Sequence, residues 1–206
     1  MIIRAAVLLL WAVAASAGML ALTDYATAPG EMASAPERWP AESRIERAAF
    51  HDVILLFAHP RCPCTGAALA ELERIEPHLG SNVELHVVFV RPPGCDDAWV
   101  EDRLWQEVRS HPGLLVDIDG DGREARIFGA RTSGHVVVYR QSGALAFAGG
   151  ITPARGHQGD SRGRSAVLDV FLGRASTVRS APVFGCPLFA SDQAKDATCH
   201  EAGAHP

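Results

Sequence analysis

Two cysteines separated by a single proline, Cys62-Pro63-Cys64, stand between an apolar run and a stretch of helical spacing. The run at 53–57 is rich in β-branched and aromatic residues, so it predicts a buried strand that stops at His59-Pro60-Arg61. From residue 65 to 79 apolar residues recur every three or four positions, which predicts a helix. The two thiols are therefore expected where a helix begins, with Pro63 in its first turn.

A thiol at the start of a helix is in a setting that favours its reactive form. Unpaired backbone N–H groups stabilise the thiolate, and Arg61 adds a positive charge nearby. A bond between Cys62 and Cys64 would close a very small loop, so it would constrain little of the unfolded chain and would be strained and easily reduced. We therefore expect a redox pair in which Cys62 attacks and Cys64 resolves. Two inert buried cysteines are the alternative.

The N-terminal 23 residues predict a membrane anchor or a signal peptide. No charged residue occurs between Arg4 and Asp24, and about 20 apolar residues suffice to span a bilayer. The small residues Ala15-Ser16-Ala17 offer a cleavage site, but apolar residues continue beyond it, which favours the anchor. Because Arg4 precedes the segment, the rest of the chain is expected on the exported, periplasmic or extracytoplasmic side.

The remaining residues predict one α/β domain. Residues 24–47 are rich in Pro, Ala, Glu and Ser and are expected to form a tether, followed by a domain at 48–190 and a polar tail at 191–206. A net charge of -5 without a basic cluster argues against a nucleic-acid partner. Strands alternating with helices, then a hairpin, indicate a layered fold with a central mixed sheet. Strands are expected at 53–57, 83–90, 114–116, 136–139 and 144–148, and helices at 65–79, 97–111, 124–128 and 164–172.

The order of these elements, with a dithiol after the first long core strand, resembles the thioredoxin fold. Membrane-attached proteins of the TlpA/ResA type carry a Trp-Cys-x-x-Cys motif at this place, whereas this chain has one residue fewer between its cysteines. Four further motifs lie at 59–64, 132–135, 149–157 and 182–188. Through them the chain is more similar to the RedB-type group, over roughly residues 50 to 190, a length typical of one domain. The resemblance implies thiol-disulfide exchange or a redox relay, with a protein thiol or disulfide partner or a membrane electron donor.

One departure from the thioredoxin pattern concerns the substrate groove. Thioredoxin-like proteins shape that groove with a cis-proline just before the strand that faces the active-site helix. Here the corresponding residues are Thr132-Ser133-Gly134-His135, and a cis bond without proline is costly. A trans loop shaped by Gly134 is expected instead. This puts in doubt the capture of a substrate by strand-like pairing beside the dithiol.

Several residues are candidates to support the two thiols. His59 precedes the dithiol, and His135 ends the motif at 132–135. Arg155 and His157 belong to a segment dense in Gly and Pro. That segment either returns a cation and an imidazole toward the thiols, where they would lower a thiol pKa or move protons, or forms an irregular surface connection.

Cys186 stands among apolar residues near the end of the domain, so its segment is expected to pack back on the fold. It would then be a third sulfur beside the dithiol or a lone buried cysteine. Cys95 and Cys199 are expected to form an incidental pair or to remain free thiols.

A metal-binding module is the second functional hypothesis. Redox exchange needs no cofactor, but Cys62 and Cys64 with a histidine such as His59, His135 or His157, or with Cys186, would suit Cu(I) or zinc. Proteins of the SCO type bind copper through two cysteines and a histidine, although their cysteines are spaced three apart. A non-catalytic scaffold is a third possibility. The acidic run 117–122 begins like a calcium loop but has Phe128 at its twelfth position, so a solvated turn is expected.

Overall fold

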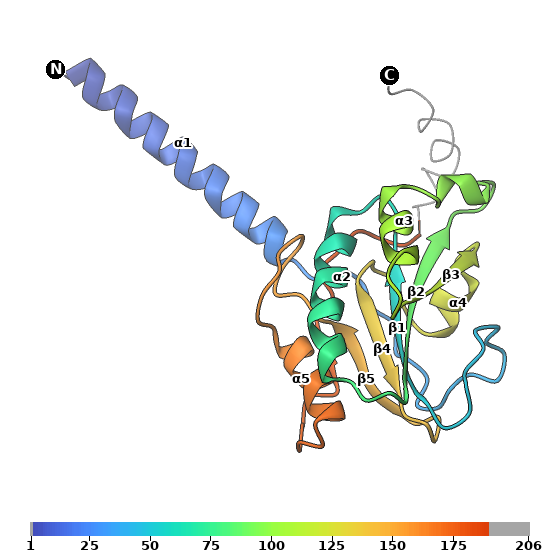
Figure 1. The fold of residues 1–206 in the computed structure, drawn as a ribbon. Helices are drawn as coiled ribbons and strands as arrows, with labels where there is room; N and C mark the ends of the chain where they lie inside the picture. Colours follow the sequence, from blue (N-terminus) through green and yellow to red (C-terminus); the bar gives the residue numbers. More distant parts are fainter. Residues whose placement is uncertain (1, 190–206) are drawn as a thin grey trace.

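A computed structural model describes residues 2–189 of the chain, and Figure 1 shows its arrangement. A long N-terminal helix precedes an α/β domain with strands and helices in alternation. The helices are α1 (Ile2–Thr27), α2 (Pro63–Ile75), α3 (Arg103–Arg109), α4 (Arg123–Ile127) and α5 (Arg162–Phe171), with 3-10 turns η1 (Glu76–His78) and η2 (Asp97–Trp99). The strands are β1 (Asp52–Ala58), β2 (Val83–Arg91), β3 (Leu115–Gly120), β4 (His135–Tyr139), β5 (Leu145–Gly150) and β6 (Ser180–Ala181).

The strands form one mixed six-stranded sheet in the order β3-β2-β1-β4-β5-β6. Strand β1 pairs in parallel with β2 and antiparallel with β4, so it lies inside the sheet. Every residue from 53 to 58 is 0% exposed, which explains why β1 reads as a continuous apolar run rather than an alternating one. The predicted α/β layered fold with a central mixed sheet is confirmed.

The two faces of the sheet are covered by different elements. On one face, apolar residues of α2, α3 and α5 pack with Ile54, Leu56 and Val138. Helices α2 and α5 lie side by side on this face in Figure 1. On the other face, α4 packs with Leu55 and Val137. Successive strand residues therefore contribute to opposite layers, as the pleat requires.

Two predicted helices differ in their bounds. The helix expected at 65–79 begins at Pro63 and ends at Ile75, because Pro77 lacks the N–H that an α-helix needs and the chain continues as η1. The helix expected at 97–111 is divided into η2 and α3. Asp102 causes the second start, since its carboxylate accepts the N–H groups of Leu104 and Trp105 at 3.0 and 3.3 Å.

The solvated turn predicted at 117–122 is wrong, because Asp117 and Asp119 belong to β3 and only Asp121 and Gly122 form the turn. Asp119 is 3% exposed. Its carboxylate accepts the backbone N–H groups of residues 124 and 125 at 2.9 and 2.8 Å, so it caps α4. Burial raises the pKa of Asp119, against the effect of these hydrogen bonds.

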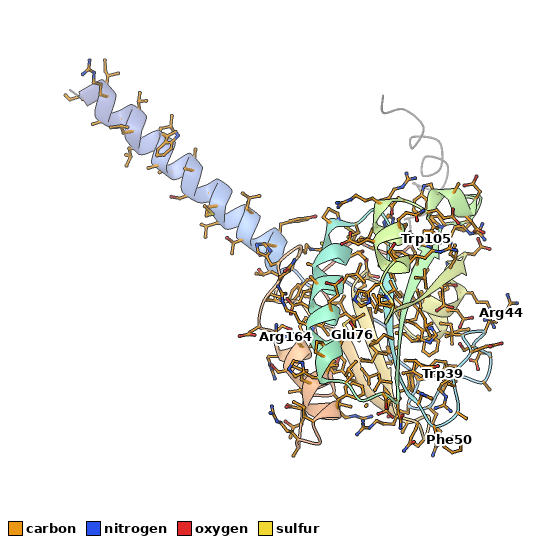
Figure 2. All side chains as sticks on the ribbon, viewed as in Figure 1. Trp39, Arg44, Phe50, Glu76, Trp105 and Arg164 are labelled. Atoms are coloured by element: carbon orange, nitrogen blue, oxygen red, sulfur yellow. The ribbon has the colours of Figure 1, made fainter. Side chains whose placement is uncertain are left out.

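Helix α1 extends away from the domain in Figure 1, and none of its residues is buried. It is long and apolar enough to cross a membrane, with a mean hydropathy of 2.2 over its most apolar window. Of the tether expected at 24–47, residues 24–27 continue α1, and the rest lies against the domain. The Tyr139 hydroxyl, for example, donates to the Pro36 carbonyl at 2.7 Å. The Trp39 ring also packs edge-on against Phe128 and Tyr139, and Figure 2 labels Trp39.

A glycine pair holds α5 close to the sheet. A Cβ atom on Gly163 would come within 1.8 Å of the Gly150 carbonyl oxygen, whereas a Cβ on Gly66, in α2, would meet nothing within 4 Å. We expect Gly163→Ala to lower the free energy of unfolding by about 1–3 kcal/mol, because the backbone of β5 must move. Gly66→Ala is the matched control and should be neutral or stabilise by up to about 1 kcal/mol. Urea unfolding followed by tryptophan fluorescence measures both, and equal effects would contradict the close packing.

Candidate functional site

Cys62 stands where the loop after β1 meets α2. It is the N-cap residue of α2, with extended backbone angles (φ −102°, ψ 120°), and no side-chain oxygen caps this helix. The Thr65 N–H donates to the Cys62 carbonyl at 2.9 Å, and the nearby backbone N–H groups of Cys64 and Thr65 act to lower the pKa of the Cys62 thiol. Cys62 is 3% exposed and Cys64 8%. The Cys62 sulfur therefore lies at the start of a helix, the position where a helix stabilises negative charge.

A third sulfur, that of Cys186, lies against this helix start. The Sγ atoms of Cys62 and Cys186 are 2.9 Å apart, and the sulfurs of Cys62, Cys64 and Cys186 all lie within 4.8 Å of one another. The expectation that the terminal segment packs back and brings Cys186 to the dithiol is confirmed. All three cysteines are free thiols. Cys95 is disulfide-bonded, and Cys199 lies outside the described residues.

The three thiols differ in their acidity. Burial raises the pKa of Cys62, but hydrogen bonds from the Cys186 thiol and from the start of α2 outweigh it, so the pKa lies below the ordinary value. Burial and then the neighbouring Cys62 raise the pKa of Cys64. Burial and the hydrogen bond to Cys62 raise the pKa of Cys186 to about 12. The negative charge of the cluster is therefore expected on Cys62, the sulfur that a nucleophilic step needs.

His59 and Arg61 lie in the loop before Cys62 and contact Trp99. The His59 ring packs edge-on against Trp99, with ring centroids 5.5 Å apart. The guanidinium of Arg61 lies 4.6 Å from the centre of the same ring, so its charge is directed to Trp99. Burial, and then the charge of Arg61, lowers the pKa of His59. Both side chains therefore pack against Trp99 just before the start of α2.

The loop after β5 brings Arg155 to the sulfurs but leaves His157 outside. Arg155 donates to the carbonyl of Gly185, next to Cys186, and its charge lowers the pKa of both Cys64 and Cys186, against the larger effect of burial. His157 is exposed, and its Nδ1 lies 2.7 Å from the Arg155 carbonyl oxygen. Of the two residues of this loop that were predicted to return to the dithiol, Arg155 lies near the sulfurs and His157 does not.

His135 is fully buried in β4 and lies away from the dithiol helix. By the alternation of strand residues it shares a face with Val137 and Tyr139, whereas α2 packs on the opposite face. Within residues 2–189, neither ring nitrogen has a hydrogen-bond partner. Burial lowers the pKa of His135 to about 4, so the ring is neutral at pH 7.

Two hydroxyl residues that the sequence reasoning missed connect the loop 132–135 to the dithiol loop. The Ser133 Oγ accepts the His59 N–H at 2.9 Å and donates to the Thr65 Oγ1, 2.7 Å away. The Thr65 hydroxyl in turn donates to the His59 carbonyl at 2.9 Å. Thr65 directly follows the Cys-Pro-Cys motif and Ser133 belongs to the Thr-Ser-Gly-His motif. These positions are the signal in the sequence that could have identified them. Gly134 has φ +90°, and residues 2–189 contain no cis peptide bond, so the predicted trans loop shaped by Gly134 is confirmed.

Glu71 is a further residue that the sequence reasoning missed. It connects α2 to the loop at 151–161, called the Arg155 loop below, which lies between β5 and α5. Its side chain is 0% exposed, accepts the Gly159 N–H at 2.7 Å and forms an ion pair with Arg164 at 2.8 Å. Figure 2 labels Arg164 on α5, beside α2. A carboxylate buried this deeply requires such partners, so Glu71 holds α2, the Arg155 loop and α5 in register.

The spacing of the sulfurs indicates which chemistry the cluster suits. Two thiolates bound to one tetrahedral ion at a metal–sulfur distance of about 2.3 Å lie about 3.8 Å apart. The Cys62 and Cys186 sulfurs are closer than that, at 2.9 Å, and need only a small approach to form a bond with each other. In the described part of the chain, the sole group of potential soft-metal ligands is this set of three cysteines, without a histidine.

Comparisons with known proteins show the fold of this chain but not its activity. No protein-family model and no curated protein matches the sequence. An uncharacterized conserved protein from Geobacillus kaustophilus is similar in structure, with a TM-score of 0.55 and 14% identity over 81% of this chain and 94% of its own. A hypothetical protein from Sinorhizobium meliloti 1021 has a TM-score of 0.53 and 20% identity over 68% and 79%.

A third similar structure is the pneumococcal exposed lipoprotein thioredoxin from Streptococcus pneumoniae strain TIGR4. Its TM-score is 0.42, with 19% identity over 60% of this chain and 85% of its own. The chain has a thioredoxin-like fold: a central strand leads to a helix that begins with the cysteines, and the hairpin of β4 and β5 pairs with the opposite edge of that strand from β2. The assignment to the RedB-type group stays a prediction.

The buried neutral His135 makes stability depend on pH. Its unfolded pKa is about 6.5 and its folded pKa about 4, so the unfolded chain binds a proton in this window and the folded protein does not. The stability held above pH 6.5 is therefore lost as the pH falls toward 4, by about 3 kcal/mol. We expect His135→Leu to lack this part of the pH dependence, measured by urea unfolding at several pH values. The exposed control His157→Gln should keep it; an unchanged pH profile in His135→Leu would contradict the assignment.

Proposed function

We propose that this protein is a thiol-disulfide oxidoreductase or redox relay in which Cys62 is the nucleophile. The observation that carries the proposal is the Cys62 sulfur at the start of α2, with a second sulfur 2.9 Å away. Helix N–H groups favour its thiolate, and the neighbouring thiol is placed to complete an exchange. We also propose that the chain belongs to the RedB-type group, on the motifs described above.

The exchange proceeds in two substitutions at sulfur. The Cys62 thiolate attacks one sulfur of a partner disulfide, the partner's S–S bond breaks, and its other sulfur leaves as a thiolate. A second thiolate of the cluster, from Cys64 or Cys186, then attacks the Cys62 sulfur and releases the first partner sulfur. The partner disulfide has gained two electrons, and the cluster dithiol has become a disulfide. A thiol protein or a membrane electron donor restores the dithiol, and the steps reverse for an oxidising role.

A membrane-attached, exported location is part of the proposal. The Arg155 N–H donates to the Ala26 carbonyl in the last turn of α1 at 2.9 Å, and its guanidinium lies 5.2 Å from the Tyr25 ring centre. The same side chain reaches Gly185, next to the sulfur cluster. The cluster thus lies close to the end of the apolar helix, where a partner in the membrane could reach it.

The proposal is tested by the reaction of the reduced full-length chain, in detergent, with an aromatic disulfide that releases a coloured thiolate. Cys62→Ser should slow the reaction on the order of 100-fold, because the remaining thiols have raised pKa values and little thiolate. The control His157→Gln changes an exposed residue and should react like the parent. In cells, the double variant Cys64→Ser/Cys186→Ser should accumulate mixed disulfides that Cys62→Ser lacks. Equal rates in Cys62→Ser and parent would refute the role of Cys62.

A soft-metal site is the second candidate, favoured by the three sulfurs within 4.8 Å of one another. Cys62, Cys64 and Cys186 would hold Cu(I) through three thiolates, after the Cys62 and Cys186 sulfurs move apart. The test is anaerobic loading of the reduced full-length chain with Cu(I), followed by dialysis against a competing thiol. Retention of one copper per chain, lost in Cys186→Ser and kept in His157→Gln, would support this function. No retained copper would exclude it.

A further inference from the structure

The segment from Phe184 to Leu188, called the strap below, pairs with the loop in front of β4. The Ser133 N–H donates to the Cys186 carbonyl and the Leu188 N–H donates to the Arg131 carbonyl, both at 2.8 Å. Thr132 and Pro187 form an antiparallel bridge between these two bonds. The strap therefore lies along the loop as a short added strand.

This loop corresponds to the one that shapes the substrate groove in thioredoxin-like proteins. An extended partner peptide that paired there would need the N–H of Ser133 and the carbonyl of Arg131, the groups a strand edge offers. Both are taken by the strap. The strand-like pairing that the missing cis-proline puts in doubt is thus present, but its occupant is the chain itself.

The strap fits this place closely at Gly185. A Cβ atom there would lie 2.0 Å from the Ser133 carbonyl oxygen, so only glycine permits this approach of the two backbones. The approach sets the next residue, Cys186, with its sulfur 2.9 Å from that of Cys62. A strap one residue out of register would direct the sulfur away from the pair, since strand side chains alternate.

The strap also covers the nucleophile. Cys62 is only 3% exposed with the strap in place, so a folded protein partner cannot bring a sulfur in line with it. The strap is held by the two backbone hydrogen bonds, the Arg155 bond to Gly185, the contact of Cys186 with Cys62 and the buried Leu188 side chain. A cleft of about 480 Å³ borders it, lined by Arg131, Thr132, Gly185 and Pro187 among others. Upstream, Val183 is fully buried and anchored by a hydrogen bond from Gly30.

We propose that the strap is an internal substrate: it occupies the partner's groove, and its Cys186, rather than Cys64, is the resolving cysteine that forms a disulfide with Cys62. In the oxidised protein the Cys62–Cys186 bond fastens the strap over the nucleophile. A partner thiolate attacks the half-buried Cys186 sulfur of this bond, forms a mixed disulfide with it and displaces Cys62 as a thiolate. The strap is then free, and its movement exposes the pairing edge at 131–133. This inference rests on the proposed function and adds to it which thiol resolves and what must move before a protein partner binds.

The first test maps the disulfide formed when the reduced full-length chain is oxidised mildly, by mass spectrometry of its peptides. The proposal expects the Cys62–Cys186 link in the parent and in Cys64→Ser, and no Cys62 disulfide within the chain of Cys186→Ser. With a Cys-containing peptide disulfide, the mixed disulfide at Cys62 should persist at least ten times longer in Cys186→Ser than in Cys64→Ser. A Cys62–Cys64 link in the parent, or a mixed disulfide that Cys64 resolves equally fast, overturns it.

The second test measures the strap itself by amide hydrogen exchange of the peptide that covers 184–188. Reduction should speed its exchange at least tenfold in the parent and should change nothing in Cys186→Ser, where no bond can fasten it. Leu188→Ala removes the strap's buried side chain without touching a sulfur, and it should speed formation of the mixed disulfide and slow its resolution. Leu172→Ala, at a residue 42% exposed on the far end of α5, is the control and should match the parent. Equal protection in both redox states overturns the moving strap.

The two proposals fail differently. If no mixed disulfide forms at Cys62 in any variant, the proposed function is wrong. If it forms but Cys64 resolves it while the strap stays protected, the function stands and the internal substrate is wrong.

Discussion

Burial of strand β1 on both faces and along both edges is the constraint from which the site follows. Its residues 53–58 have no solvent exposure, so neither its register nor its end point can shift without placing polar backbone in the core. The chain must turn sharply after Ala58, because α2 already starts at Pro63. This fixes the Cys62 sulfur at the helix start, where three further features converge: the Ser133 hydroxyl, the Arg155 charge and Cys186.

The sequence predicts features that depend on residues close together in the chain, and it misses features that depend on residues far apart in the chain. The strand before Cys62, the helix after it and the packing of Cys186 follow from local spacing and from apolar residues that need burial. Glu71 and Ser133 were missed because they bond to residues 88 and 74 positions away, and no periodic pattern reports such pairs. Asp119 looked like a solvated residue, since an acidic run near a glycine has the composition of a turn. Its burial depends on α4 folding back onto β3.

The polar groups around the cluster have separate tasks. Glu71 holds the Arg155 loop with its charge, and Arg61 lies over Trp99. Arg155 brings a cation to the sulfurs, where its charge acts to lower the pKa of Cys64 and Cys186. His135 supplies no proton there, because it is neutral and lies on the other face of the sheet. The lowered pKa of Cys62 thus comes from the neighbouring Cys186 thiol and from backbone N–H groups rather than from a titrating imidazole.

The contact between Arg155 and the last turn of α1 also bears on processing. Cleavage after Ala17 would remove most of the apolar helix yet leave Tyr25 and Ala26, the two residues that meet Arg155. A released form and a membrane-held form would therefore share one geometry at the sulfurs. The two forms would differ in how they encounter a partner: the released form by diffusion in solution, and the membrane-held form by diffusion along the membrane.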